Sequence, residues 1–440
     1  MKLINGLVGA AVLIALLENR EPYVALAAII MLLLWSASLR LSKALGFKRL
    51  EWAIVICLSY WIASYFWSTG DFHNFISFAF IRQDGALLVS YTAFLGFLGW
   101  GLKPLQFRRY WLLFIFLCAL LAVPGLLYCL HLAPESYYLE RLGIVGGDVW
   151  GRKFTGFWQA HNTTGGVYAL ASVLALALLR DAPLTPKMKQ LLQVLFLVCL
   201  GGLLFSYSRG SYLGFLVGAA FILPLRKVGT TLRAALLIGI PVVLLGLMTS
   251  SVFNRIDSIA DPDYGTAADR FVIWGEALDD FAASPIIGIG YGRFNDDVTG
   301  WAGVKSLVWV GVRGVIQNND AHAHNSYLHF MAEGGIIGLW LTLRIWWYAW
   351  AELSFYEEKM AKTRLRGFHK AAKACMLCIL MMSVTEHMLG KGSVVMVAMS
   401  LIGMLIASSR IEWRALEQAQ RTTRVSFRIP VPAGEVALSR

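Results

Sequence analysis

The stretch that decides the fold runs from Asn318 to Gly338 and reads Asn-Asn-Asp-Ala-His-Ala-His-Asn-Ser-Tyr-Leu-His-Phe-Met-Ala-Glu-Gly-Gly-Ile-Ile-Gly. Its first part is polar and rich in imidazole, and its second part opens a long apolar helix. His324 stands at the seam, and Asn325 and Ser326 after it are residues that commonly cap a helix start. The positive end of a helix dipole disfavours imidazolium, so we expect a neutral ring that can take a proton.

The composition of the chain is that of a helical membrane protein. Its 440 residues are 58% hydrophobic and 15% charged, whereas soluble domains carry roughly 25% charged residues. Apolar runs of about 20 residues, each long enough to cross a bilayer, recur along the chain. We therefore expect an all-α polytopic protein with twelve spans, at about 3–18, 23–39, 51–68, 84–101, 110–130, 164–180, 190–206, 211–226, 233–250, 325–351, 371–388 and 393–409.

The loops between these spans predict the orientation. Most of the 39 lysines and arginines fall in segments that the positive-inside rule assigns to the cytoplasm, namely 40–50, 103–109, 180–189, 226–233, 359–373 and 410–440. Both termini are then cytoplasmic. The expected parts are nine spans in 1–250 with an outer loop at 131–163, a large outer loop at 251–324, three spans in 325–409 and a basic cytoplasmic tail at 410–440. Topology accounts for the net charge of +12, so the charge requires no nucleic-acid partner. As a membrane protein, the chain is expected to contact membrane lipids.

Cations on the outer side, where the same rule disfavours them, are candidates for binding an anion. The 131–163 loop holds Arg152 and Lys153 and ends near His161; surface charge paired with nearby acidic residues is the alternative. Arg209 lies in the short outer turn 206–211. An ionisable group at that membrane boundary is costly and is a functional candidate by default, although a structural arginine reaching toward water is possible.

One amphipathic helix is expected in the 251–324 loop. Residues 266–269 resemble a capping start, and Ser284-Pro285 ends the pattern. Its apolar stripe would lie on the membrane domain or in the interface, and Arg270 in its first turn would point to the bilayer boundary. The stripe consists of Phe271, Trp274, Leu278 and Phe281. Three glycines follow, which we interpret as a flexible turn rather than a phosphate cradle: Gly288, Gly290 and Gly292.

Outer arginines beside a neutral histidine suit one kind of reaction. Arginines bind a diphosphate through forked hydrogen bonds and offset the charge of a leaving group, while the histidine takes a proton from an attacking hydroxyl. A diphosphate at the bilayer boundary implies a lipid carrier. A metal site built from His322, His324 and His329 near Asp320 is the competing interpretation. On a helix, however, His329 lies about 140° around from His324, so we expect no metal and no cofactor. The structural alternative is that His324 has no chemical role and only caps the helix.

Several segments resemble the bacterial O-antigen ligases, whose superfamily includes O-antigen polymerases and O-linked oligosaccharyltransferases. His324-Asn325, nine residues, then Gly335 and Gly338 resembles the ligase motif. The twelve-span layout with one large outer loop is also similar. The other similar segments are Ser208-Arg209-Gly210, 270–274 and 284–294.

This resemblance implies a GT-C-like, inverting glycosyltransferase of a Gram-negative inner membrane that needs no metal or nucleotide. It would transfer a glycan from undecaprenyl diphosphate to a sugar hydroxyl of lipid A–core at the periplasmic face. By the resemblance, His324 is the general base and Arg209 and Arg270 bind diphosphate. Weaker correspondences add further substrate-binding candidates: Arg152, Lys153, His161 and Asn325.

Two alternatives stay open. The first is a sibling enzyme, either a polymerase or an oligosaccharyltransferase acting on protein; the short tail disfavours the latter. The second is a transporter of polyprenyl-linked glycan, which predicts broken helices and ionisable residues in mid-span. Arg344 and the glycines at 334, 335 and 338 would fit a transporter, but we interpret the glycines as sites of close helix packing.

Overall fold

The computed structural model describes residues 48–68, 85–132, 145–148, 151–156, 160–223, 265–294, 322–360, 363, 365, 367–390 and 392–426. The expected spans at 3–18, 23–39 and 233–250 lie outside the described residues. The described elements, in chain order, are α3 (Arg49–Ser68), α6 (Ala86–Phe97), α7 (Pro104–Cys129), β1 (Val145–Asp148), β2 (Gly151–Phe154), α9 (His161–Asp181), α10 (Pro186–Phe205), α11 (Arg209–Ile222), α14 (Gly265–Ala283), α17 (Ser326–Lys359), α18 (Phe368–Met382) and α19 (Gly392–Ser426).

Helices long and apolar enough to cross a bilayer are present, which confirms a multi-pass membrane protein. Five helices of the described residues meet this standard of length and composition: α3, α7, α9, α10 and residues 392–420 of α19. α6 and α11 are shorter apolar helices. Nine of the twelve expected spans each coincide with one described helix, while the full count of twelve stays a prediction.

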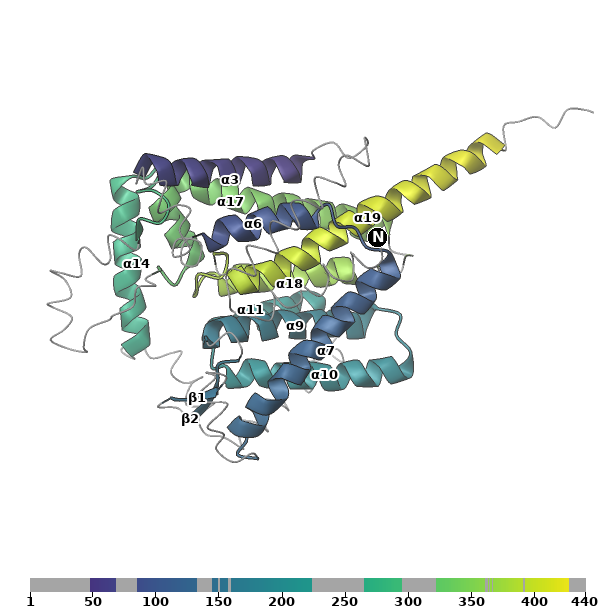
Figure 1. Ribbon diagram of the computed structural model, residues 1–440, viewed down its shortest axis with the longest axis horizontal. Helices are drawn as coiled ribbons and strands as arrows, with labels where there is room; N and C mark the ends of the chain where they lie inside the picture. Colours follow the sequence, from purple (N-terminus) through teal and green to yellow (C-terminus); the bar gives the residue numbers. More distant parts are fainter. Residues whose placement is uncertain are drawn as a thin grey trace, which may run out of the picture.

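The long helices run side by side and α14 lies across one end of them (Figure 1). We call this the α14 end. The last residue of α3 lies there, since a Cβ on Gly290 would come within 2.1 Å of Ser68. α9, α11 and α17 begin at this end, and α10 and α18 finish there (Figure 1). This alternation is the one that the sequence predicts for the outer side.

α9 occupies the centre of the bundle. Its sequence is apolar on all sides, which is typical of a helix surrounded by other helices, and residues 163–178 are all buried. Small residues allow the neighbouring backbones to come close: a Cβ on Gly165 would lie 2.7 Å from Ser206 Oγ. α10, which packs beside it, begins with Pro186 at its first turn and with Thr185 Oγ1 accepting from Met188 N at 3.4 Å, a capping arrangement.

The structure differs from the sequence expectation in the 131–163 loop, at the end of α18 and after residue 409. An antiparallel hairpin of β1 and β2 stands beside the helices in a chain expected to be all-α. α18 ends at Met382, whereas the expected span ran to 388, so residues 383–390 form turns. α19 continues as a helix to Ser426, so the first part of the tail expected at 410–440 extends the helix of the last span.

α14 confirms the amphipathic helix but not its expected stripe. Ala277 is fully buried in a small cluster with Phe294, Ala323 and Ala332, whereas Leu278 is 49% exposed. Trp274 Nε1 donates to the carbonyl oxygen of Ala323 at 2.9 Å. Ala277 thus faces the cluster in place of Leu278, while Trp274 keeps the inward position that the expected stripe gave it.

α17 is broken at Gly335, where φ is 60° and ψ is −165°. The segment after α14 fills the break with a short ladder of backbone hydrogen bonds: Ile289 N to Ala332 O, Gly290 N to Glu333 O, Ile336 N to Pro285 O and Ile337 N to Ile286 O, at 2.9–3.3 Å. The glycines at 288, 290 and 292 all have positive φ, and Gly288 and Gly290 belong to this pinned segment. The expected flexible turn is thus a fixed one.

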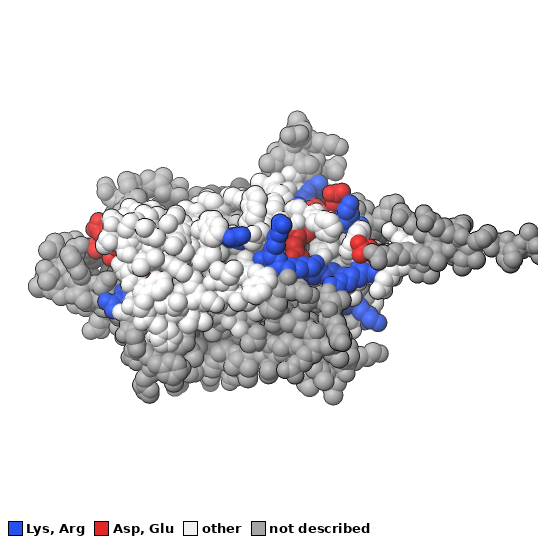
Figure 2. All heavy atoms as spheres, turned by 90° about the horizontal axis from the view of Figure 1, so that it is seen from above, with Lys and Arg blue, Asp and Glu red and all other residues white. Residues whose placement is uncertain are grey.

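Charge is distributed unevenly along the bundle. Figure 2 shows lysine and arginine gathered toward the end where α19 projects, with a broad uncharged zone between them and the α14 end. At that far end Arg410, which is 3% exposed, pairs with Glu51 of α3 and with Glu352 of α17, the latter at 2.6 Å. The ion pairs tie three helices together where they leave the expected bilayer.

Replacing Gly335 by alanine should destabilise the protein. A left-handed φ costs an L-residue about 1–2 kcal/mol, and a Cβ at this position would lie 2.3 Å from the carbonyl oxygen of Ile286. The matched control is Gly275→Ala in α14, where a Cβ would meet nothing within 4 Å and helix propensity predicts a gain of about 0.5–1 kcal/mol. Apparent melting temperatures in one detergent should fall for Gly335→Ala and hold or rise for Gly275→Ala. Equal melting temperatures would show that the break is not constrained.

Candidate functional site

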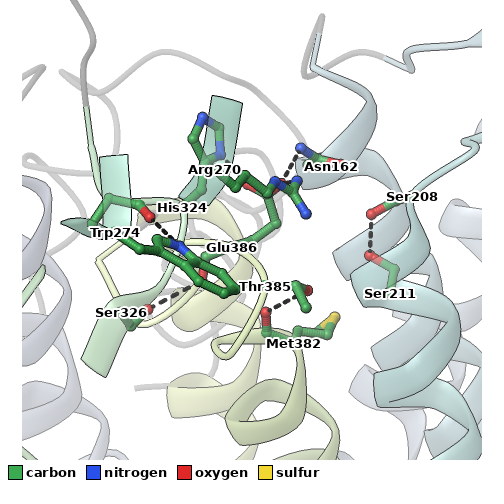
Figure 3. A network of polar contacts seen from close by, with 11 residues as sticks. Asn162, Ser208, Ser211, Arg270, Trp274, His324, Ser326, Met382, Thr385 and Glu386 are labelled. Carbon is green, nitrogen blue, oxygen red and sulfur yellow. Dashed lines mark hydrogen bonds and ion pairs between the residues drawn. The ribbon is translucent and has the colours of Figure 1, made fainter. Parts of the chain in front are cut away.

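A buried carboxylate stands at the centre of the polar network at the α14 end. Glu386, in the turn after α18, is 1% exposed. Its Oε1 accepts from Asn162 Nδ2 at 2.7 Å and from Arg270 Nη2 at 2.5 Å, and its Oε2 lies 3.1 Å from His324 Nδ1 (Figure 3). α9, α14, the turn before α17 and the turn after α18 each contribute one of these side chains.

Local hydrogen bonds hold the Glu386 turn in place. The backbone N of Glu386 donates to Met382 O at 3.0 Å, which continues the end of α18 into a turn. Ser326, the first residue of α17, donates from its backbone N to Ser383 O at 2.8 Å. Its hydroxyl donates to the Glu386 carbonyl oxygen and accepts from Leu389 N at 3.1 Å. The start of α17 and the Glu386 turn are therefore fixed to each other, and with them the spacing of His324 and Glu386.

His324 has a strained backbone and a capped helix directly after it. Its φ of 47° is in the left-handed region, which is sparsely populated by residues other than glycine and is found often at functional sites. Asn325 Oδ1 accepts from Tyr327 N at 2.9 Å and from Leu328 N at 3.1 Å. The expected helix start, with Asn325 as the cap and Ser326 as the first helical residue, is confirmed. Asn325 itself uses its side-chain oxygen for the cap, so a contact of this residue with substrate stays a prediction.

The partner of His324 decides which ring nitrogen can accept a proton. An ionised carboxylate only accepts hydrogen bonds, so Nδ1 of a neutral His324 must carry the proton that points to Glu386. Nε2 then holds the lone pair. The contact with Glu386 thereby fixes the orientation and the tautomer of the His324 ring.

Arg209 lies at the same end, next to the Glu386 turn. It opens α11, and a Cβ on the following Gly210 would come within 2.1 Å of Thr385 Oγ1. This close approach brings the first turn of α11 against the residue that precedes Glu386. Ser208 and Ser211 share a hydrogen bond of 2.8 Å beside it (Figure 3).

The candidates of the 131–163 loop are divided between the hairpin and the start of α9. Arg152 pairs with Gly147 and Lys153 with Gly146 in the β1–β2 register. Phe154 anchors the hairpin, since it is fully buried and its ring centroid is 5.6 Å from that of Tyr168. His161 is the first residue of α9 and stands next to Asn162 in the network. Arg152 and Lys153 thus lie near this end of the bundle, and their contact with substrate stays a prediction.

Three further histidines surround the network. The rings of His322 and His324 are 4.3 Å apart between centroids. His329 Nε2 faces Glu333 Oε2 at 3.4 Å, and its ring is 4.2 Å from that of His387. The metal set considered from sequence, with His329 as a member, is therefore not assembled. Asp320 lies outside the described residues. The potential ligand atoms that come together, all within 4.8 Å of one another, belong to His322, His324 and Glu386.

Glu386 and Asn162 were missed by sequence reasoning. Glu386 lay within the expected span 371–388, where an ionisable side chain is a functional candidate by default, so that rule could have found it. Asn162 stood beside His161 without a signal that separated it from a helix-start residue. Arg270 was predicted to face the bilayer boundary, and the structure directs it to Glu386.

Removing the Glu386 charge should destabilise the protein through Arg270. Breaking a buried ion pair costs about 3–5 kcal/mol, and we expect the lower end because the Arg270 side chain is 21% exposed. In a double-mutant cycle, Glu386→Gln and Arg270→Gln should show a coupling of about 1–3 kcal/mol, measured from chemical denaturation in detergent. Glu358→Gln is the control, since its side chain is 78% exposed and should change little. Additive effects of the two substitutions would contradict the pairing.

Comparison with known proteins gives a family for the central third of the chain. No curated protein matches the sequence. Residues 194–343 match the family model described as O-Antigen ligase. The matched segment includes Arg209, Arg270 and His324, whereas Asn162 and Glu386 lie outside it. The resemblance is thereby confirmed for this segment, which is similar to the O-antigen ligase family.

Proposed function

We propose that this protein is an O-antigen ligase: it transfers a glycan from undecaprenyl diphosphate to a sugar hydroxyl of lipid A–core, with inversion at the sugar carbon. The match of residues 194–343 to the O-antigen ligase family supports ligase- or polymerase-type activity on a polyprenyl-linked glycan and a lipid acceptor. The single observation that carries the assignment to this site is the Glu386 carboxylate, which joins Arg270 to His324.

The donor diphosphate is bound by arginine in this proposal. A guanidinium has five N–H donors, of which the described contact with Glu386 uses one, so Arg270 can still form forked hydrogen bonds to phosphate. Arg209, at the start of α11 beside the Glu386 turn, is the second diphosphate ligand. Together they offset the negative charge that develops on the leaving diphosphate.

His324 acts as the general base. Its Nε2 takes the proton of the acceptor hydroxyl as the acceptor oxygen forms a bond to the anomeric carbon. The bond from that carbon to the diphosphate oxygen breaks, and its electron pair leaves with the diphosphate. Glu386 holds the ring through Nδ1 and stabilises the imidazolium that results, as the carboxylate of a catalytic triad does. No step requires a metal ion or a nucleotide.

The charge distribution supports a periplasmic site. Lysines and arginines gather at the end opposite to α14, and such residues are enriched on the cytoplasmic side of membrane proteins. The α14 end then faces the periplasm of a Gram-negative inner membrane, and both chain termini are cytoplasmic. A lipid-linked donor can reach this end from the outer leaflet while its polyprenyl tail stays in the bilayer.

The break in α17 is the observation that favours a transporter, because transporters build their sites from broken helices. In such sites the freed backbone groups coordinate the substrate. Here Ala332 O and Glu333 O accept from residues 289 and 290, and Gly334 O accepts from the hydroxyl of Tyr60 at 2.6 Å. The protein itself satisfies the break, so we favour the enzyme. Gly334 and Gly338 pack on Trp61, as expected for close packing, whereas Gly335 is the point at which the helix is broken.

Substitution of His324 tests the general base. Asparagine tolerates left-handed φ better than alanine does, so His324→Asn removes the imidazole with little added strain. The rate of glycan transfer should fall by about 10²- to 10⁴-fold, while the protein accumulates normally. The control is His131→Asn, since His131 also has a positive φ, of 58°, and lies in an exposed position after α7. A His324→Asn enzyme with the rate of the control would remove the base from the mechanism.

The choice of acceptor separates the ligase from its siblings. Purified protein is incubated with undecaprenyl diphosphate-linked glycan and, in separate reactions, with lipid A–core, with a second lipid-linked glycan and with an unfolded periplasmic protein. We expect transfer to lipid A–core, and transfer that persists in EDTA. Elongation of the second glycan instead would assign a polymerase, and labelling of the protein an oligosaccharyltransferase. Loss of activity in EDTA that a divalent ion restores would contradict the metal-independent mechanism.

A further inference from the structure

We propose that His322, His324 and Glu386 form a binding site for Zn²⁺ that switches the general base off. This inference rests on the proposed function for its effect on catalysis, but not for the binding itself. One potential ligand atom from each residue lies within 4.8 Å of the other two. Two imidazoles and one carboxylate are a usual ligand set for zinc with a fourth position left open.

The spacing of His324 and Glu386 already suits such a centre. Zn²⁺ binds nitrogen and oxygen at about 2.0–2.2 Å in a tetrahedron, so neighbouring ligand atoms stand about 3.3–3.5 Å apart. His324 Nδ1 and Glu386 Oε2 are 3.1 Å apart, so a small opening of this pair admits the ion. His322 is stacked close to His324, with ring centroids 4.3 Å apart. A rotation of the half-buried His322 ring supplies the third ligand.

Binding of zinc at Nδ1 changes the tautomer of His324. Without metal, Nδ1 carries the proton that Glu386 accepts, and Nε2 holds the lone pair. A neutral imidazole that coordinates a metal through Nδ1 must carry its proton on Nε2. Nε2 then has no lone pair with which to take a proton from an acceptor hydroxyl. The metal also replaces the stabilising carboxylate by a positive charge. Zinc therefore inhibits, although the proposed reaction needs no metal.

Arg270 competes with the metal for the same carboxylate. Its Nη2 donates to Glu386 Oε1 at 2.5 Å, and its charge repels an incoming cation. Asn162 Nδ2 also donates to Glu386 Oε1, at 2.7 Å. Two imidazoles lie nearby: the centroid of His387 lies 5.8 Å from that of His322, whereas His329 is directed to Glu333. The affinity for zinc therefore depends on how strongly Glu386 binds the metal compared with how strongly it pairs with Arg270.

Zinc binding is measured directly on the purified full-length protein in detergent, with an affinity tag that contains no histidine. Isothermal titration with ZnCl₂ should give one site per chain. His322→Asn should weaken it by more than about tenfold, since even the hydrogen-bond partners of metal ligands contribute 10- to 100-fold. Arg270→Gln should tighten it severalfold. The matched control is His329→Asn, which should leave the affinity unchanged. Co²⁺ provides a second readout through the visible spectrum of a four-coordinate nitrogen and oxygen site.

The outcomes separate this proposal from the proposed function. No stoichiometric binding, or equal affinities of the wild type and His322→Asn, would overturn the zinc site whatever the activity. If His322→Asn does not fold, the site is tested instead by the Co²⁺ spectrum of the wild type and by the change in zinc affinity that Arg270→Gln causes. In the transfer assay, Zn²⁺ should inhibit the wild type, and EDTA should reverse the inhibition. For each variant, inhibition is measured relative to its own metal-free rate. His322→Asn should require a zinc concentration at least about tenfold higher for the same inhibition. An inactive protein that binds zinc as described would contradict only the enzyme assignment.

Discussion

The ionised carboxylate of Glu386 constrains the α14 end more than any other described group there. A buried charge is tolerated only where a counter-charge and hydrogen bonds surround it, so residues from distant parts of the sequence must converge on it. Asn162, Arg270 and His324 do so from three different segments. The same requirement that stabilises the fold places a guanidinium and an imidazole side by side. Folding and the proposed chemistry thus depend on one ion pair.

A second constraint keeps this network in position. The break at Gly335 exposes backbone groups that a continuous helix would have used internally. Residues 285–290 satisfy them, and Gly292 N and Phe294 N donate to Glu333 Oε1 at 3.0 and 3.4 Å. The loop amides therefore hold an anion, as glycine-rich turns often do, but the anion is a side chain of the protein. α14, which precedes this segment, is thereby fixed against α17, and with it Arg270.

The sequence was sufficient for the membrane class, for the helices that are described and for the start of α17. These depend on local patterns, namely apolar length, capping residues and helical spacing. Arg209 could be selected because a charge at the membrane boundary is costly, whereas His324 and Arg270 were selected from their places at the starts of helices. Glu386 broke such a rule as an ionisable residue inside the expected span 371–388, but it was overlooked. Apolar length alone did not show that α18 ends at Met382.

The rest of the site could not be predicted from local pattern. The approach of Gly210 to Thr385 and the rotation of α14 toward Ala277 depend on the shapes of surfaces far apart in the chain. The hairpin of β1 and β2 is short and glycine-rich, so it carries little periodicity. Its anchoring residue, Phe154, is recognisable only once its neighbours in the fold are known.

The location of Glu386 bears on how this protein can be divided. The family segment ends at residue 343, and the counter-ion of its histidine lies 43 positions further along the chain, in the connection between α18 and α19. The segment that matches the family model is consequently not a self-sufficient module. Chimeras that graft it into another scaffold must carry the α18–α19 connection with it, or else supply a carboxylate at the same place.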